Sequence, residues 1–386
     1  MRLFKIVCRG SKLSLAQANI FKEKFMDAHD GVKVEIIVKE TEGDTNQWQP
    51  LTEMEGKDFF TKDIQDYLLS GKADFAIHSM KDVSGDFFFK NNSYAVIERD
   101  EVHDVAVFNE SVIDKLKKGE RLFIGTSSPR RMEMASEFLL KALPSVNGQK
   151  VNISTSMIRG NVDTRLRKLD AGEYDGIILA CAGLNRLLRD EYSKQEVSAL
   201  LDDKKLMILP LLECPPAPGQ GAIVAETSPG NEEAIRILRS LNVEHLAKAI
   251  SVERKLANRY GSGCHQKFGV AHINTGDFSF TYAAGKDRNG KQFTEIEPKE
   301  ILLKDEETIS NEGRWKLSDQ LNINLITSSE GIEQNGRSNQ KNWVIKTGLW
   351  FDLAPRGMWV QGSLEGFGLK FIEKTIRSPL VAQNKV

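Results

Sequence analysis

Residues 63–80, DIQDYLLSGKADFAIHSM, decide the fold class of this 386-residue chain. Apolar residues at helical spacing come first, Gly71 ends the helix, and the apolar run that follows Asp74 predicts a strand. The stretch 163–183, DTRLRKLDAGEYDGIILACAG, has the same order of amphipathic helix, glycine, aspartate and apolar strand. Alternating helices and strands are typical of α/β architecture, and the repeated order predicts two similarly built lobes.

The same alternation extends in both directions from this stretch. Residues 3–8 and 32–40 read as strands around a helix in 14–28, and residues 119–143 open the second lobe as strand, turn and helix. The proline-rich stretch LPLLECPPAPGQGA, 209–222, breaks the periodicity and predicts a crossing or hinge. Beyond about residue 300 the chain is polar, until an apolar pattern returns at 342–376.

Composition excludes several classes of protein. Hydrophobic residues make up 40% and charged residues 28%, with 53 basic against 54 acidic side chains, which describes a globular chain rather than a polycation. Neither a basic stripe nor a nucleic-acid-binding motif is present, and no apolar run is long enough for a membrane span or a secretory signal. We therefore expect a cytoplasmic protein that binds neither nucleic acid nor membrane.

Four cysteines occur, and none belongs to a C-x-x-C pair. This spacing disfavours a zinc ribbon or a redox dithiol and suits a reducing compartment, so no metal is expected. Cys264 stands out because it lies between glycines in YGSGCHQKFG, 260–269. With His265 it could ligate a metal or form a thiol–imidazole pair, but the open glycine setting also suits a covalent anchor.

Arginines gather where the predicted strands end. In GTSSPRR, 125–131, a serine caps a helix, Pro129 suits its first turn, and Arg130 and Arg131 follow. Two cations at a helix start oppose the helix dipole, which favours a bound anion over a capped helix with solvated arginines. Further basic or polar residues at such junctions are Arg9, Ser11, Lys57, Arg159, Arg165 and Arg186.

Since ligands of α/β sheets bind at the strand ends, these residues together predict a ligand with several carboxylates or phosphates. No nucleotide-binding glycine motif is present. The stretch 74–86, DFAIHSMKDVSGD, adds Lys81 and Asp82 at the end of a strand. Asp82 could stabilise a cation or exchange a proton with a substrate ammonium, or it could form an ordinary surface pair with Lys81.

Several of these stretches, in this order, resemble the porphobilinogen deaminase family over about residues 3–300. They are CRGSKLSLAQA, EGDT, GKDFFTKDI, ADFAIHSMKDV, IGTSSPRR, RGNVDTRLRKLDAGEYDGIILACAGLNRL, PGQGA and ER…GSGCHQKFG. The resemblance implies an α/β fold with two periplasmic-binding-protein-like lobes and a smaller α+β C-terminal domain. The implied boundaries are 1–103 with 216–235 for lobe 1, 104–215 for lobe 2, and 236–386 for the cysteine-bearing domain, with an atypical extension from about 300.

The resemblance also implies a reaction. Cys264 would hold a dipyrromethane cofactor through a thioether, four porphobilinogen molecules would be deaminated and added in turn, and hydrolysis would release hydroxymethylbilane for haem biosynthesis. Asp82 aligns with the catalytic aspartate of the family. The residues that match cofactor-binding positions are Lys81, Asp82, Ser128, Arg130, Arg131, Arg159 and Arg165. The residues that match substrate-binding positions are Arg9, Ser11, Lys57, Phe60 and Arg186.

The chain departs from the family pattern at Asp58, where glycine is usual, and at Ser84, where proline is usual. The rival interpretation is a two-lobed anion-binding or regulatory protein without turnover, which would need neither Asp82 nor Cys264. We expect a monomer, and a further hypothesis is that the C-terminal extension contacts another enzyme of the pathway.

Overall fold

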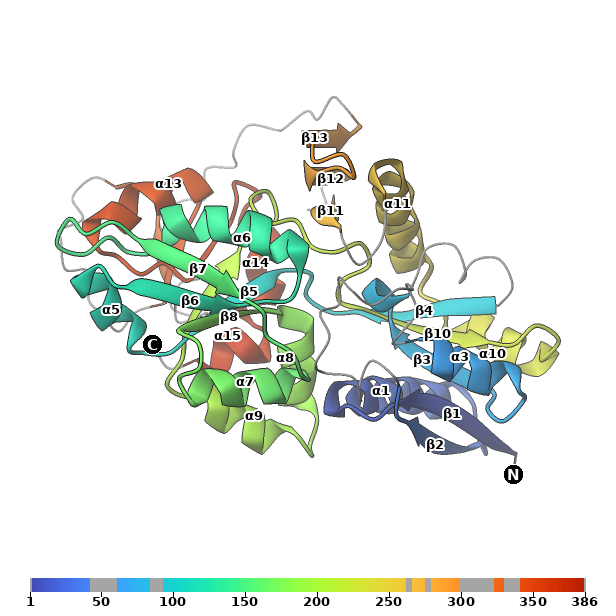
Figure 1. Cartoon of the computed structure of the whole chain (residues 1–386). Coiled ribbons are helices and arrows are strands. Elements are labelled where there is room, and N and C mark those ends of the chain that lie inside the picture. Colours follow the sequence, from blue (N-terminus) through green and yellow to red (C-terminus); the bar gives the residue numbers. More distant parts are fainter. Residues whose placement is uncertain are drawn as a thin grey trace.

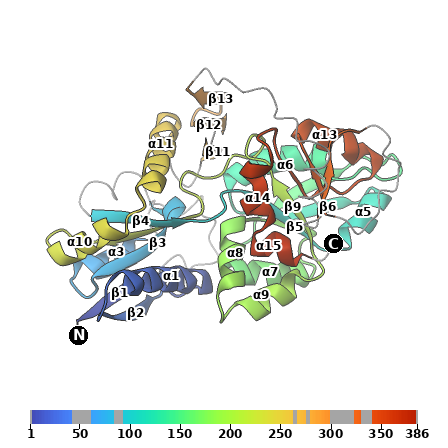
Figure 2. The same ribbon diagram turned by 180° about the vertical axis from the view of Figure 1, so that it is seen from behind.

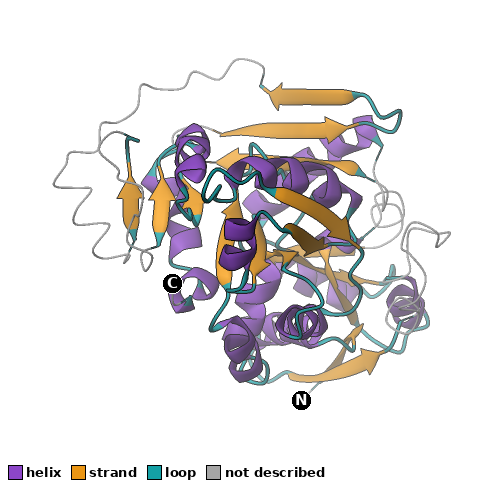
Figure 3. Cartoon of the chain, turned by 60° about the vertical axis from the view of Figure 1, so that its left-hand side comes forward, coloured by secondary structure: helices purple, strands orange, loops and turns teal. Residues whose placement is uncertain are grey.

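The computed structural model describes residues 2–41, 61–83, 93–261, 266–274, 279–298, 323–329 and 341–384. Two α/β lobes lie side by side, and a smaller α+β unit lies next to their junction (Figures 1 and 2). Helices cover the sheets of both lobes (Figure 3). No helix among the described residues is both long and apolar enough to cross a membrane.

Lobe 1 is built on a five-stranded sheet of order β2-β1-β3-β10-β4, in which β10 is antiparallel to both neighbours. Its elements are β1 (Leu3–Arg9), α1 (Lys12–Ala28), β2 (Lys33–Lys39), α3 (Lys62–Leu69), β3 (Phe75–Ser79), the 3-10 turn η1 (Met80–Asp82), β4 (Ser93–Arg99), β10 (Ala222–Thr227) and α10 (Glu232–Leu241). The helix predicted at 14–28 buries Ala18, Phe21 and Phe25 against the sheet, as their helical spacing indicates.

Lobe 2 has a five-stranded sheet of order β7-β6-β8-β5-β9, in which β5 is the antiparallel strand. Its elements are β5 (Asp104–Phe108), α5 (Val112–Lys118), β6 (Arg121–Gly125), α6 (Pro129–Ala142), β7 (Asn152–Ser156), α7 (Val162–Asp170), β8 (Gly176–Ala180), α8 (Cys181–Arg189), α9 (Lys194–Leu201) and β9 (Lys205–Leu209). In both sheets three parallel strands are followed by one antiparallel strand and an outer strand. The prediction of two similarly built α/β lobes is therefore confirmed.

The chain crosses between the lobes twice, at 100–103 and at 210–221, and each crossing leads into the antiparallel strand of the next sheet. The second crossing is the proline-rich stretch that the sequence singles out. The two crossings touch, because Asp100 N donates to Gly221 O at 2.9 Å. Gly221 has a φ of +82°, and a Cβ there would lie 2.7 Å from Asp100 O, so a side chain would separate the crossings.

The α+β unit consists of α11 (Glu244–Tyr260) and the antiparallel strands β11 (Lys267–Asn274), β12 (Ser279–Lys286) and β13 (Gln292–Glu297). Leu256 of α11 packs on Phe268 and Val270 of β11. β11 also meets the second crossing, since Val270 N donates to Pro216 O at 2.8 Å.

The C-terminal segment forms β14 (Asn324–Ile326), β15 (Asn342–Val344), α13 (Thr347–Leu353), η2 (Ala354–Arg356), β16 (Gly362–Ser363), α14 (Leu369–Ile376) and α15 (Pro379–Gln383). The helices α13, α14 and α15 lie beside the elements of lobe 2 (Figure 2). The apolar side chains of the segment complete the two cores of that lobe. Trp350 is fully buried, packs edge-on against Phe138 of α6, and donates from Nε1 to Ala142 O at 3.0 Å. The expected division stays a proposal, and we propose to group residues 341–384 with lobe 2 rather than with the α+β unit of α11 and β11–β13.

Candidate active site between the lobes

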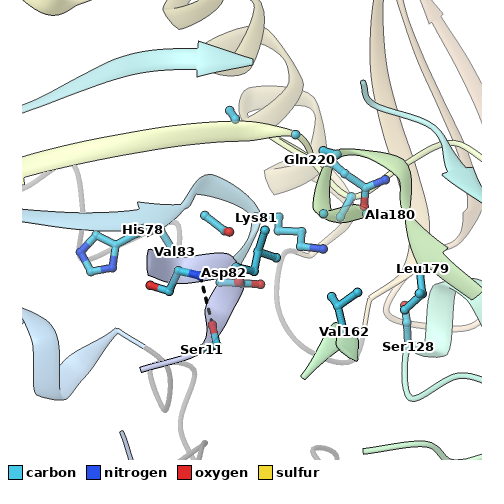
Figure 4. A pocket seen from close by; sticks show the side chains of 18 of the residues that line it. Ser11, His78, Lys81, Asp82, Val83, Ser128, Val162, Leu179, Ala180 and Gln220 are labelled. Carbon is cyan, nitrogen blue, oxygen red and sulfur yellow. Dashed lines mark hydrogen bonds between the residues drawn. The ribbon is translucent and has the colours of Figure 1, made fainter. Parts of the chain in front are cut away.

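A cavity of about 440 Å³ lies between the lobes, at the ends of the strands (Figure 4). Residues of both lobes, of the second crossing and of α11 line it. The site residues expected from the sequence that line this cavity are Arg9, Ser11, Lys81, Asp82, Ser128, Arg130, Arg131, Arg159, Arg165 and Arg186. The structure thus brings together every expected site residue that it describes.

Three expected site residues, Lys57, Phe60 and Cys264, lie outside the described residues, as do Asp58, Ser84 and His265. The described residues nearest to Cys264 in sequence are Gly261, where α11 ends, and Gln266, which lines the cavity. Asn258, in the last turn of α11, also lines it.

Lobe 1 supplies the first strand-to-helix turn. Ser11 is the N-cap of α1 and its hydroxyl accepts from Ser14 N at 3.1 Å, while Arg9 N donates to the hydroxyl of Ser14 at 3.1 Å. These bonds satisfy backbone donors at the start of the helix and fix the turn that carries Arg9 into the cavity wall.

Lys81 and Asp82 stand on η1, the turn that follows β3 (Figure 4). Arg254 of α11 clamps this turn, donating to Val83 O at 3.0 Å and to Met80 O at 3.5 Å. The Lys81 side chain is open to the cavity. Removal from bulk water lowers the pKa of Lys81 to about 8; Asp82 opposes this shift and the nearby Arg131 adds to it.

On the opposite wall, Ser128 caps α6, and Arg130 and Arg131 open it with their side chains almost fully buried. Both guanidinium groups bind one carboxylate, that of Asp104, at 2.7 Å each. Burial by itself raises the pKa of Asp104, but Arg130 and Arg131 hold it well below its usual range. The carboxylate of Asp104 thus compensates part of the positive charge at the start of α6. From the sequence we expected a bound ligand alone to supply this negative charge.

The other arginines reach the cavity from lobe 2. Arg165 Nε donates to Gly160 O at 2.8 Å, and burial, with Arg131 and Arg159 nearby, lowers the pKa of its guanidinium to about 10. Arg186 donates to Gly221 O at 2.5 Å and lies 3.7 Å from Glu98, so it also joins lobe 2 to lobe 1. Burial lowers the pKa values of Lys81, Arg159, Arg165 and Arg186, and neighbouring cations add to this shift at Lys81, Arg165 and Arg186. So many cations around one cavity indicate a site that suits a polyanion.

Sequence reasoning missed Asp104, Gln220 and Arg254 as parts of the site. Gln220 donates to Asp104 at 2.9 Å and to Val102 O at 2.7 Å, which holds the arginine pair and both crossings together. Arg254 left a signal, because Ile250, Arg254 and Ala257 follow helical spacing and place a charge on the buried face of α11. The sequence contains no such signal for Asp104, since its partners Arg130 and Arg131 lie 26 and 27 positions away.

Chemically, the cavity joins many cations with two carboxylates, those of Asp82 and Asp163. The cations can hold several carboxylate groups of a ligand at once, and Asp82 is placed to stabilise a cation or to exchange a proton within hydrogen-bond reach. The arrangement suits a ligand that carries several carboxylate groups.

Comparison with protein families gives a match over residues 4–236, more than half of the chain, to the family described as "Porphobilinogen deaminase, dipyromethane cofactor binding domain". The matched residues include both lobes and every described site residue that the sequence predicted.

Solved structures of similar shape are distant in sequence. A Streptococcus mutans chain associated with glutathione import through GshT and the cystine importer TcyBC is 12% identical, with a TM-score of 0.34 over 69% of this chain and 98% of that chain. The probable amino-acid transporter extracellular-binding protein YtmK of Bacillus subtilis is 10% identical, with a TM-score of 0.34 over 67% and 97%. An amino-acid transporter substrate-binding protein of Streptococcus pneumoniae, bound to L-arginine, is 11% identical, with a TM-score of 0.33 over 67% and 94%.

Proposed function

The chain belongs to the porphobilinogen deaminase family, and we propose that it is a hydroxymethylbilane synthase. In this reaction four porphobilinogen molecules are deaminated and joined head to tail on a covalently held dipyrromethane primer, and hydrolysis releases hydroxymethylbilane. The observation that carries the proposal is the single cavity in which the basic residues from both lobes surround Asp82.

Each pyrrole unit brings two carboxylates, so a growing chain needs several cationic partners. Arg9, Arg159 and Arg165 would bind these carboxylates from both sides of the cavity, and the Ser11 and Ser128 hydroxyls would add hydrogen bonds. Lys57, Phe60 and Arg186 complete the proposed substrate contacts. Holding both partners in one cavity makes each coupling effectively intramolecular.

Asp82 is the proposed catalytic group. Its protonated carboxyl group would pass a proton to the departing amine. The carboxylate that remains would stabilise the cation and, after coupling, would recover a proton from the pyrrole. The clamp of Arg254 on the carbonyls of Met80 and Val83 fixes the turn that carries it. Lys81, beside it, would neutralise a substrate carboxylate.

The donor set fits a dipyrromethane. Half-buried Arg159 and Arg165 and the open Lys81 provide cationic donors, and Arg131 Nε is a buried donor without a hydrogen-bond partner in the described parts of the chain. We propose that Lys81, Asp82, Ser128, Arg130, Arg131, Arg159 and Arg165 hold the group and that Cys264 anchors it. When bound, it supplies the pyrrole carbon to which the first substrate unit is added.

Intact mass spectrometry of the denatured protein tests the proposal. We expect wild type to carry the added mass of two condensed porphobilinogen units, Cys264→Ala to lack it, and Cys8→Ala to keep it. Cys8 is a matched control because it is buried in lobe 1, where burial raises its pKa to about 11 and makes it a poor nucleophile. A wild-type chain that stays unmodified and releases no ammonia with porphobilinogen would instead support the anion-binding alternative.

We further propose that the protein acts as a cytoplasmic monomer. Contact between the C-terminal segment and another enzyme of the pathway remains a proposal. The segment buries its apolar side chains against lobe 2, so such a contact would use its exposed polar residues, such as Lys370 of α14 and Arg377, which follows that helix.

A further inference from the structure

The C-terminal segment reaches the second crossing through one buried carboxylate. Glu365, between β16 and α14, has a side chain that is 1% exposed. Its two oxygens accept from the backbone N–H groups of Leu211 and Leu212 at 2.8 and 2.9 Å. Buried backbone donors need partners, and here the partner is supplied from more than 150 positions further along the chain.

The same carboxylate faces the first crossing. Glu365 Oε1 lies 3.5 Å from Nε2 of His103, whose Nδ1 lies 2.5 Å from Glu101. Two residues of α14 add further bonds, from the Thr375 hydroxyl to Glu101 at 2.5 Å and from Lys374 Nζ to Arg99 O at 3.1 Å. The segment therefore binds both crossings at one place.

The backbone of Glu365 indicates that its side chain is needed there. Its φ is +55°, and among the non-glycine residues that the structure describes only Asn147 shares a positive φ. Asparagine tolerates this left-handed conformation, whereas glutamate does not favour it. Such a conformation persists where the surrounding contacts over-determine it, as the two hydrogen bonds and the ion pair do here.

Both crossings lead directly to the arginine pair of the cavity. His103 is followed by Asp104, which binds Arg130 and Arg131. Leu212 is three positions before Pro215, whose carbonyl accepts from Arg130 Nη1 at 2.8 Å. Glu365 thus holds the two backbone segments on which the arginine wall of the cavity rests.

We propose that Glu365 is a positioning residue, which fixes Arg130 and Arg131 for carboxylate binding by holding both crossings between the lobes. The C-terminal segment then contributes to the geometry of the site. The expected loss in kcat/KM rests on the proposed function. The expected loosening of the two crossings does not.

The test compares Glu365→Gln and Glu365→Gly with Asn147→Gly in the full-length protein. The glutamine keeps the shape but loses the charge and turns a donor toward one backbone N–H, whereas the glycine relieves the backbone and removes the carboxylate. Asn147→Gly is the matched control, because Asn147 has the same φ on an exposed loop away from the cavity. The readouts are kcat and KM for porphobilinogen, the melting temperature, and amide hydrogen exchange of residues 100–104 and 210–215.

We expect both Glu365 variants to lose about 10- to 100-fold in kcat/KM, mostly through KM, because misplaced arginines weaken carboxylate binding. Exchange at both crossings should accelerate, while Asn147→Gly should behave as wild type. Unchanged kinetics and exchange would overturn the inference, and so would a loss confined to the melting temperature. If wild type itself has no turnover, the proposed function fails, whereas the exchange result still decides whether Glu365 holds the crossings.

Discussion

At the scale of the residue, Asp104 sets the character of the arginine wall. One carboxylate binds two guanidinium groups, so the trio keeps a net positive charge beside the cavity. The buried anion stabilises cations that would otherwise oppose the dipole of α6, and the excess charge is left for a ligand. Arg130 and Arg131 are therefore already fixed by a partner inside the protein.

His103 provides a prediction about stability and pH. Burial disfavours its charge, but Glu101 and Glu365 raise the pKa of His103 to about 10. Because its pKa is higher in the folded protein, His103 contributes stability that is fully present below its unfolded pKa of about 6.5. This contribution is lost as the pH rises through the folded pKa of about 10. Between these values His103 should make the free energy of unfolding fall by about 1.4 kcal/mol per pH unit.

The measurement is urea unfolding of wild type and His103→Gln from pH 7 to pH 10. The difference in the free energy of unfolding between the two proteins should become smaller as the pH rises. All other titratable groups are common to both proteins, so their contributions cancel in this difference. A difference that stays constant with pH would show that His103 is neutral in the folded protein.

At the scale of the element, α11 and β11 connect the α+β unit to the rest of the site. Glu253 of α11, which is fully buried, accepts from Arg99 of β4 at 2.9 Å, from Gly219 N at 2.8 Å and from His272 N at 2.8 Å. The next residue, Arg254, clamps the Asp82 turn. One helical turn thus orients the turn that carries Asp82, the second crossing and β11 relative to one another.

Gly269 gives the prediction at this scale. β11 passes so close to the second crossing that a Cβ at Gly269 would lie 1.8 Å from Pro215 O. Gly269→Ala should therefore lower the free energy of unfolding by about 1–3 kcal/mol, because backbone must move to admit the methyl group.

Gly348→Ala is the control for this substitution. Gly348 lies in α13 with nothing within 4 Å of the added Cβ, so alanine there should stabilise the protein by about 0.5–1 kcal/mol through helix propensity. Equal effects of the two substitutions in denaturant unfolding would contradict the close approach at Gly269.

At the scale of the whole molecule, charged residues at the edge of the cavity join the lobes. Lys12 of α1 in lobe 1 pairs with Glu196 of α9 and lies 3.9 Å from Asp163 of α7 in lobe 2. Arg167 pairs with the same two carboxylates. These pairs are partly exposed, so each is worth only about 0.2–1 kcal/mol and is weakened by salt.

Charge reversal at Lys12 should therefore separate the lobes without unfolding them. We expect Lys12→Glu to have a larger radius of gyration than wild type by small-angle X-ray scattering at low salt, and the difference to shrink at about 0.5 M salt. Lys117→Glu is the matched control, because Lys117 pairs at 3.1 Å with Asp114 of its own helix, α5, within lobe 2. Identical scattering of the two variants would show that the Lys12 pairs do not hold the lobes together.

The sequence by itself determined the α/β lobes and most of the residues of the site. Helical spacing places Phe21 and Phe25 in the core, and glycine and proline mark the ends of elements, because local backbone preferences and amphipathic periods are written within a few residues. Arg9, Arg165 and Arg186 were found from their places along the chain, since Arg9 ends β1 and the other two lie on α7 and α8, the helices that follow β7 and β8.

Only the tertiary structure decided which groups those residues meet. Asp104 compensates Arg130 and Arg131, Arg254 clamps the Asp82 turn, and Glu365 binds Leu211 across 154 positions of sequence. The physical reason is that a hydrogen bond needs its two atoms within about 3 Å and an ion pair within about 4 Å. The paths of the two crossings and of the C-terminal segment bring those atoms together. No local period encodes such paths, so the partners became known only with the fold.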